Sequence, residues 1–427
     1  MLMIRPFQGI IYDEKKVGDL TKVLAPPYDV ISPSEQKFYH QLHPYNIIRI
    51  ILGEEYPADT EEENKYTRAR NYFKKWLSSG ILVKEKVPAI YVYEQEYPFE
   101  ERRVRRRGFI ALMKLEKFGS GVIFPHERTL PHARLDRLRL LRACRANFSP
   151  IFSLYSDRSH RVDERIERAS FLFSIRDKDG VRHSLGAIRD KSVIEEIAEE
   201  MKDKKVFIAD GHHRYLTALS FREEMGGKGR GEDFVMMYFL NMEGGSATIL
   251  PVHRAVRNLG VRKLAQLKES LSEFFNIEVF EFSPKDEKRQ RKRMLERLRG
   301  TGEDCAFGMY CGEKRYYFLS LKETYKDSFQ GKVDSAILNE LILEKILKRK
   351  DWKKGEDIDF VKDEEKAVSL IRKGDYQIAF FLKPPSLRQI REISLAGKVM
   401  PPKTSYFYPK LLSGLVIREL DEQNGAF

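Results

Sequence analysis

The residues most able to do chemistry stand together in one short segment, VFIADGHHRYLTAL, at positions 206–219. Residues 206–209 form an apolar run typical of a strand, and the apolar residues after position 214 recur at helical spacing. Asp210 and Gly211 are therefore the predicted turn, with Asp210 as the N-cap and Gly211 permitting a close backbone approach. A helix that begins at the next residue presents unpaired backbone amides, which is an arrangement that binds anions.

Two histidines and an arginine open this predicted helix. His212, His213 and Arg214 place cationic or hydrogen-bonding side chains at the positive end of the helix dipole, where they compete with it. Adjacent helical residues point about 100° apart, so the two histidines do not chelate one zinc ion from one face. The segment therefore favours phosphate as its ligand. The alternative is a solvated pair, or one histidine packed in the core.

Two further clusters are predicted to lie in loops. In LAPPYDVIS, residues 24–32, Pro26 and Pro27 impose an extended backbone that would aim Tyr28 and Asp29 outward. The alternative is that this segment forms a tight turn with a purely structural role. In FPHERTLP, residues 124–131, the segment HERT at positions 126–129 follows a glycine-containing turn. Glu127 there is a candidate general base or metal ligand with Arg128 as its cationic neighbour, and a surface ion pair is the alternative.

Two charged segments complete the candidates. The segment VMPPKTSYFYPK, residues 399–410, carries Lys403 and Lys410 among hydroxyl and aromatic residues, so it is either a second anion cradle or a packed terminal segment. The segment ERRVRRRGF, residues 101–109, alternates like an edge strand and is either an electrostatic patch or a solvated face.

Composition narrows the class of protein. The chain has 427 residues, 42% of them hydrophobic, which predicts two or more domains with real cores. The net charge of +13 favours anionic partners such as nucleotides, phosphorylated metabolites or nucleic acid. A high content of Glu, Lys and Arg is also typical of thermophile proteins, which explains the charge without a ligand. No GxGxxG or GxxxxGK loop occurs, so a nucleotide would bind by another route.

Cellular location follows from cysteines and hydropathy. The three cysteines, Cys144, Cys305 and Cys311, form no Cys-x-x-Cys pair, which argues against a metal site or disulfide framework and fits a reducing compartment. There is no run of eighteen apolar residues and no signal peptide at the start. A cytoplasmic protein without a membrane span is therefore expected.

The pattern of elements predicts two domains, an α/β domain at 1–260 with a mixed sheet and an α+β domain at 261–427. The expected elements of the first region are strands at 47–52, 90–93, 109–115 and 150–154 and helices at 61–79 and 134–146. Those of the second are helices at 261–275, 284–299, 335–347, 364–373 and 386–395 and strands at 277–282, 305–310, 315–321 and 376–382. No internal repeat or low-complexity linker separates the two.

Five motifs, IRPFQG, APPYDVIS, HERT, ADGHHRY and MPPKTSYFYPK, occur in this order over essentially the whole chain. This chain resembles the prokaryotic family called domain of unknown function 1015. The ADGHHR segment is in turn similar to a signature shared by ParB-type, sulfiredoxin-like and free-serine-kinase proteins, in which it follows a strand, opens a helix and binds nucleotide phosphates. That likeness implies a phosphate-binding role for Gly211, His212, His213 and Arg214, and a magnesium or hydroxyl partner in Asp210.

The resemblance implies a nucleotide-dependent phosphotransferase, a small-molecule kinase that uses ATP or ADP with Mg²⁺ and acts on a hydroxyl metabolite. In the kinase branch an N-terminal carboxylate acts as base, a role that Asp29 or Glu127 would fill. We expect Asp29, Glu127 and the turn to converge, with Lys403 closing the cleft from the second domain. The alternatives are a ParB-like nucleotide-dependent DNA-binding protein, for which no clear helix-turn-helix is found, and a nucleotide-binding module without turnover.

Overall fold

The chain forms two compact units. The computed structural model describes residues 1–427 except 128–130, 228–230, 303–304, 349–351, 354 and 422–427. Unit 1 comprises Met1–Pro125, Thr129–Ala247 and Pro409–Phe427, and unit 2 comprises His126–Arg128 and Thr248–Tyr408. The boundary between the two units therefore lies near residue 248, and the C-terminal segment belongs to unit 1. The independent folding of domains 1–260 and 261–427 stays a prediction.

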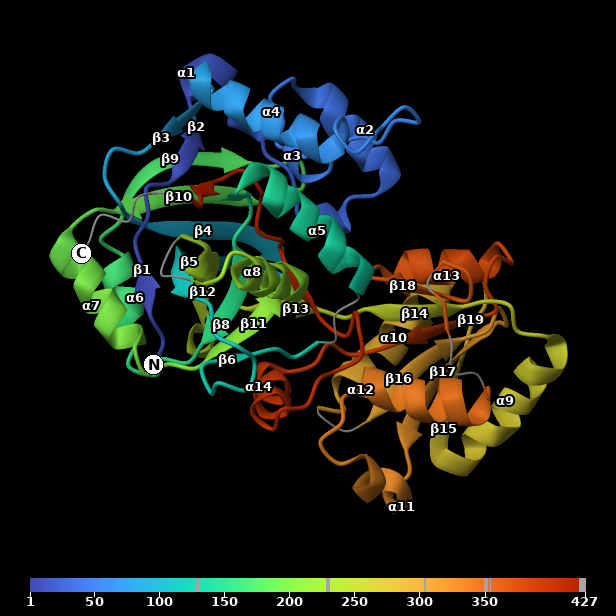
Figure 1. Cartoon of the computed structure of the whole chain (residues 1–427). Helices are drawn as coiled ribbons and strands as arrows, with labels where there is room; N and C mark the ends of the chain where they lie inside the picture. The colour runs from blue at the N-terminus through green and yellow to red at the C-terminus, as the bar shows by residue number, and fades with distance from the viewer. Residues whose placement is uncertain (128–130, 228–230, 303–304, 349–351, 354, 422–427) are drawn as a thin grey trace. The chain divides into compact units, whose positions relative to one another are not determined.

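Unit 1 is built on a nine-stranded sheet that contains both parallel and antiparallel neighbours (Figure 1). Strand β11 (Val206–Asp210) is parallel to β6 (Ile123–Phe124) and antiparallel to β8 (Ile151–Tyr155). Strand β12 (Phe234–Asn241) is parallel to β8 and antiparallel to β5 (Arg102–Lys114). The predicted mixed sheet is thereby confirmed. In spatial order the strands are β6 (Ile123–Phe124), β11 (Val206–Asp210), β8 (Ile151–Tyr155), β12 (Phe234–Asn241), β5 (Arg102–Lys114), β4 (Ile90–Phe99), β10 (Arg182–Ile188) and β9 (Ser170–Arg176), with β1 (Ile4–Arg5) paired to β5.

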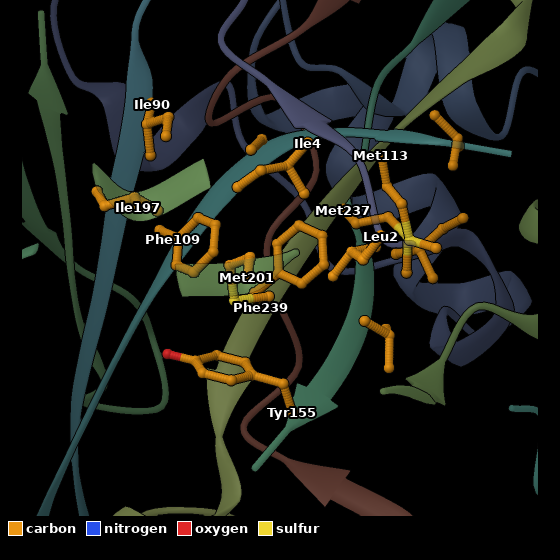
Figure 2. Packing of buried hydrophobic residues seen from close by; sticks show 14 of the residues in the cluster. Leu2, Ile4, Ile90, Phe109, Met113, Tyr155, Ile197, Met201, Met237 and Phe239 are labelled. Carbon is orange, nitrogen blue, oxygen red and sulfur yellow. The ribbon is translucent and has the colours of Figure 1, made fainter. Parts of the chain in front are cut away.

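The main core of unit 1 covers one face of this sheet. Every second residue of the central strands contributes to it, as Phe109 and Met113 of β5 and Met237 and Phe239 of β12 do (Figure 2). Successive strand residues point to opposite faces, so this alternation places one apolar set under the covering helices. Helices α6 (Arg161–Ile166), α7 (Lys191–Met201) and α8 (His212–Glu224) supply the other side of the cluster. Burial of these side chains holds α8 against the sheet.

One of the remaining helices of unit 1 forms where the sequence pattern predicts a strand. The sequence predicts a strand at 47–52, but Ile48–Ile51 form helix α3, and the Asn46 side chain accepts the Ile48 N–H at 2.9 Å where that helix begins. The strand prediction is wrong because a short apolar run has no period that separates a strand from a buried helix. The other helices are α1 (Glu14–Val17), α2 (Pro33–Leu42), α4 (Lys65–Ser78) and α5 (Pro131–Cys144).

The arginine-rich segment 101–109 extends beyond the doubly paired part of its strand. It lies in β5, whose residues from Arg102 to Arg107 pair with β4 alone in the described register, whereas 109–114 pair with β12 as well. Arg102, Arg103 and Arg105 are exposed, but Arg106 is fully buried. The predicted solvated face is therefore present at three arginines, and Arg106 departs from it because its side chain is buried.

Unit 2 has an antiparallel six-stranded sheet with helices on both faces. The order is β15 (Phe275–Glu281), β17 (Arg315–Leu321), β16 (Ala306–Tyr310), β19 (Ile378–Phe381), β14 (His253–Val256) and β18 (Ile358–Val361). Alternate residues of β16 point to opposite faces: Phe307 and Met309 join one apolar cluster, and Ala306 and Tyr310 join the other. One cluster includes α9 (Val261–Phe274), and the other includes α10 (Glu287–Arg299) and α13 (Glu364–Arg372). The predicted α+β architecture is confirmed.

Two helix boundaries of unit 2 differ from the predicted ones. Helix α10 begins at Glu287 rather than at 284, because the Asp286 carboxylate accepts both the backbone N–H and the hydroxyl of Ser283 and closes a turn before the helix. The helix predicted at 335–347 is α12 (Asp334–Ile337) followed by a π-helical segment, Leu338–Ile346. In contrast, α14 (Leu387–Leu395) starts where predicted, with a capping box between Ser386 and Gln389.

No helix in the described part of the chain is long and apolar enough to cross a bilayer.

Candidate functional site

The strand-to-helix turn at residues 206–214 forms where the sequence predicts it. Strand β11 ends at Asp210 and α8 begins at His212. The N-cap is Gly211 rather than Asp210, and it makes no side-chain cap hydrogen bond. Its φ of 96° lies in the left-handed region that glycine adopts without a steric penalty, which explains why the turn needs this residue. The Asp210 side chain is thereby left for other partners.

Two cations converge on the Asp210 carboxylate. The Arg214 guanidinium lies 3.0 Å from Oδ2, and the Lys410 ammonium contacts Oδ1. All three side chains are largely buried, with exposed fractions of 15% for Asp210, 16% for Arg214 and 11% for Lys410. The cluster therefore carries a net positive charge in surroundings where Coulomb interactions are stronger than in water.

Arg214 is fixed in place from two further sides. Its second terminal nitrogen donates to the Pro150 carbonyl at 2.6 Å. The guanidinium also folds back over Gly211, because a Cβ added at Gly211 would stand 2.8 Å from it. The cationic group thus lies at the start of α8, beside the amides that have no partner within the helix.

The C-terminal segment of unit 1 delivers Lys410 from 200 residues away. Buried Arg106 donates to the Pro409 carbonyl, and the Gln95 side chain donates to the Lys410 carbonyl at 3.0 Å. Gln95 and Arg106 are also hydrogen-bonded to each other. Adjacent strands β4 and β5 therefore hold the backbone that carries the lysine.

The histidine pair divides as adjacent helical residues must. His212 is 7% exposed, whereas His213 is half-buried. One histidine consequently packs within unit 1, and the other stays nearer to solvent at the first turn of the helix.

A small cavity lies beside Arg214 in unit 1. Arg137 of α5, Tyr28 and Thr217 contribute polar groups to its wall, and the rest is largely apolar. Its volume of about 70 Å³ admits a ring or a short substituent, not a whole nucleotide. The apolar residues of the wall are Ile51, Leu140, Leu141, Ala146, Phe148, Ile151, Ala218 and Val235.

The PPYD motif contributes Tyr28 to this cavity. The Arg137 guanidinium lies 3.8 Å from the centre of the Tyr28 ring, so Tyr28 is not aimed outward as the sequence suggests. Burial, with a smaller contribution from Asp29, raises the pKa of Tyr28 to about 12, against the opposing effect of Arg137 and Arg214. Asp29 itself is exposed, in the 3-10 turn Tyr28–Val30. Motifs that are far apart in the sequence therefore meet in one region of unit 1.

The other predicted site residues lie in unit 2 or outside the described residues. Glu127 forms a bridge with Met400, and the Lys403 carbonyl accepts a hydrogen bond from Arg254, all within unit 2. Arg128 and Thr129 of the HERT segment lie outside the described residues. The roles assigned to Glu127 and Lys403 stay predictions.

The arrangement around Asp210 does not suit the predicted magnesium ligand. Each carboxylate oxygen already has a cationic partner, Arg214 on one and Lys410 on the other. Within the described ranges, no group of three His, Cys, Asp or Glu residues is placed to hold a metal ion. Asp210 acts here as a counter-ion for two cations.

Sequence reasoning names Lys410 only in a separate candidate anion cradle, and it connects neither Lys410 nor Arg137 nor Arg106 with Asp210. Lys410 is one of several cations near the end of the chain, and nothing local connects it with Asp210. Arg137 is one of four arginines of α5, and its burial and its contacts with the Tyr28 ring and the Ile51 carbonyl distinguish it. A signal exists for Arg106 alone, since it is an arginine at the edge of an apolar strand pattern.

Comparison with known proteins identifies the family. The profile described as "Protein of unknown function (DUF1015)" matches residues 4–341, about four fifths of the chain. The chain belongs to this family, as its five motifs suggest. The match ends before the MPPKTSYFYPK segment. No curated protein has a significantly similar sequence.

Solved structures show only a distant likeness. A free serine kinase in complex with AMP is 16% identical with a TM-score of 0.35, and the match covers 70% of this chain and 86% of that one. SbnI with a C-terminal truncation, from Staphylococcus aureus, is 13% identical with a TM-score of 0.38 over 74% and 90% of the two chains. A conserved hypothetical protein from Pyrococcus furiosus is 15% identical with a TM-score of 0.34 over 71% and 92%. TM-scores below 0.5 establish no shared fold.

Proposed function

We propose that this protein is a nucleotide-dependent phosphotransferase that binds the phosphates of ATP or ADP at the start of α8 and phosphorylates a small hydroxyl metabolite, free serine being the first candidate. The observation that carries the proposal is the pair of cations, Arg214 and Lys410, on the single carboxylate of Asp210 at the N-terminus of a 13-residue helix. The similarity of ADGHHR to nucleotide-binding signatures supports the same ligand.

Phosphate binding would use groups that already point to one place. An anion at the first turn of α8 would accept backbone N–H groups and gain from the helix dipole. Arg214 and Lys410 are held beside that turn by Asp210, so little side-chain entropy is lost when they turn to a phosphate. Asp210 would balance their charge while no ligand is bound.

A carboxylate near the same region would orient the hydroxyl nucleophile. We assign this role to Asp29, because it directly follows Tyr28, whose ring contributes to the cavity beside Arg214. A solvent-accessible carboxylate can accept a proton from a substrate hydroxyl as the new bond to phosphorus forms.

Isothermal calorimetry tests the binding site. Arg214→Met should weaken ADP binding about 10- to 150-fold, the scale of roughly 1.5–3 kcal/mol for a charge-assisted hydrogen bond. Arg142→Met, which removes an exposed arginine of α5 paired with Glu224, is the matched control and should leave affinity unchanged. Equal affinity in folded Arg214→Met protein would remove α8 from consideration.

Mass spectrometry of reactions with ATP or ADP and a panel of hydroxyl metabolites tests turnover. Asp29→Asn should slow product formation about 100-fold or more, the usual contribution of a general base, with ADP affinity preserved. Binding without any product would leave a nucleotide-binding module. Nucleotide-dependent retention of a DNA duplex in a gel would support the ParB-like alternative instead.

A further inference from the structure

A buried guanidinium lines a second cavity, in unit 2. The cavity has a volume of about 200 Å³, and its wall includes Arg254, Asn339, Trp352, Phe360 and Pro402. Arg254 lies in β14, between β18 and β19, and is 1% exposed. A charged side chain this deep in a sheet is rare unless an opposite charge accompanies it.

Arg254 uses little of its hydrogen-bonding capacity. One terminal nitrogen donates to the Val252 carbonyl at 2.8 Å, and the other donates to the Lys403 carbonyl at 3.0 Å. A guanidinium offers about five N–H groups, so these bonds leave most of them for other acceptors. Within the described parts of the chain, no carboxylate forms an ion pair with it, although Glu127 is near enough to raise its pKa. Burial dominates and lowers the pKa of Arg254 to about 9.

Arg106 of unit 1 shows how a buried arginine looks when protein groups satisfy it. Its exposed fraction is 0%, and it donates to the Gln95 side chain from two nitrogens and to the Pro409 carbonyl. Its guanidinium also lies 5.0 Å from the centre of the Phe152 ring. Arg254 makes two hydrogen bonds where Arg106 makes at least three, and a cavity adjoins it, which points to an acceptor supplied from outside the chain.

The wall of the cavity indicates the chemistry of that acceptor. The Phe360 ring lies 4.4 Å from the Arg254 guanidinium and covers one of its faces. Asn339 provides an amide, and Trp352 and Pro402 provide apolar surface. Planar guanidinium groups bind carboxylate and phosphate through paired N–H donors. Glu344 is the acidic residue of this wall.

We propose that this cavity of unit 2 is a binding site for a small metabolite bearing one oxyanion group, a carboxylate or a phosphate, which Arg254 receives while Trp352 and Phe360 flank the rest of the ligand. The site is independent of the one at the start of α8. It also assigns part of MPPKT a role, since Pro402 lines the cavity and the Lys403 carbonyl holds Arg254.

Tryptophan fluorescence provides a direct test, because the chain has two tryptophans and Trp352 is the one that lines the cavity. In a Trp76→Phe background, sodium acetate and sodium phosphate are titrated separately at constant ionic strength against sodium chloride. We expect a saturable change in emission with at least one of the two oxyanions, and the responding salt identifies the head group. Arg254→Met should weaken that response by about tenfold or more, the effect of losing a charge-assisted hydrogen bond.

Arg257→Met is the matched control. Arg257 follows the same strand, stacks on Tyr376 and donates to the Glu356 carbonyl, so its loss should leave the titration unchanged. Asn339→Leu replaces the amide of the cavity wall by an apolar group while keeping Arg254, and it decides the matter if Arg254→Met is unfolded by circular dichroism. No saturable response in the Trp76→Phe protein, or an equal response in folded Arg254→Met or Asn339→Leu, would overturn the proposal.

Discussion

The two units handle buried charge in opposite ways. In unit 1, Asp210 has two cationic partners, Arg214 and Lys410, and the three side chains satisfy one another. In unit 2, Arg254 is more deeply buried; among the described residues it donates to backbone carbonyls and lies against an aromatic ring, but it forms no ion pair. Removing a charge from water costs several kcal/mol unless an opposite charge compensates. This desolvation cost is offset by ion pairs at Asp210 and, in the described part of the chain, is not offset by an ion pair at Arg254.

An anionic ligand would therefore meet different requirements at the two sites. At Asp210 an incoming phosphate must compete with a carboxylate that is already in place, so binding exchanges one anion for another. At Arg254 the proposed ligand would supply a directly bound counter-ion, because Glu127 raises the pKa of Arg254 without an ion pair among the described residues. We therefore expect the first site to exchange anions and the second to retain a small anion.

The largest expected effect concerns His253, which is adjacent to Arg254 and 2% exposed. Burial, together with the charges of Arg254 and Arg299, lowers the pKa of His253 to about 3. Since the unfolded chain takes up this proton first as pH falls, the contribution of neutral His253 to stability is complete above about pH 6.5 and is lost towards pH 3, by up to about 5 kcal/mol.

Urea unfolding over a range of acidic to neutral pH measures this loss. His253→Gln keeps an acceptor for the Leu382 N–H but does not titrate, so its stability should fall less steeply than that of the wild type. Parallel curves for the two proteins would show that His253 is not the group responsible, and the contrast between the units would lose its support in unit 2.

The second prediction tests the paired cluster of unit 1. Asp210→Asn leaves Arg214 and Lys410 as neighbouring cations without their carboxylate, and should lower the free energy of unfolding by about 2–4 kcal/mol. Adding Lys410→Met should restore part of this loss, because one of the two repelling charges is removed. Urea titrations of the single and double variants give the coupling.

Asp29→Asn is the control for that series, since Asp29 forms no ion pair in the described part of the chain and should change stability by no more than about 0.5 kcal/mol. If Asp210→Asn behaves like this control, the cluster contributes nothing and the two units do not differ in the way described.

The third prediction concerns the turn itself. Gly211→Ala imposes a positive φ on a residue with a Cβ and pushes that Cβ against the Arg214 guanidinium, so it should cost about 2 kcal/mol. Gly119→Ala has a similar φ of 91° but open space around its Cβ, so it should cost about 1 kcal/mol. Thermal unfolding of both variants measures the difference, which reports the Arg214 contact alone. Equal losses would show that Arg214 moves away from the new side chain without cost.

Some features are predictable because they are local. Apolar residues followed by Asp-Gly and a helical period specify β11, the left-handed Gly211 and α8, and Ser386 with Gln389 specifies the start of α14. Short-range rules fail at α3, where an apolar run that reads equally well as a strand follows Asn46 and becomes a helix. They fail again in β5, where alternation alone does not show that Arg106 is fully buried while the adjacent Arg105 is exposed.

The family, the mixed sheet with a second α+β region, and the position of the strand-to-helix turn could all be predicted from the sequence alone. Each of them depends on neighbouring residues or on motifs in a fixed order. Tertiary structure alone decided that Lys410 meets Asp210, that Tyr28 stacks on Arg137, and that Arg254 is enclosed without an ion-paired carboxylate among the described residues. Those facts depend on which segments pack together after long loops close. The sequence specifies which side chains are charged. The ion-pair partner of each charged side chain and the extent of its burial depend on which distant segments pack against one another.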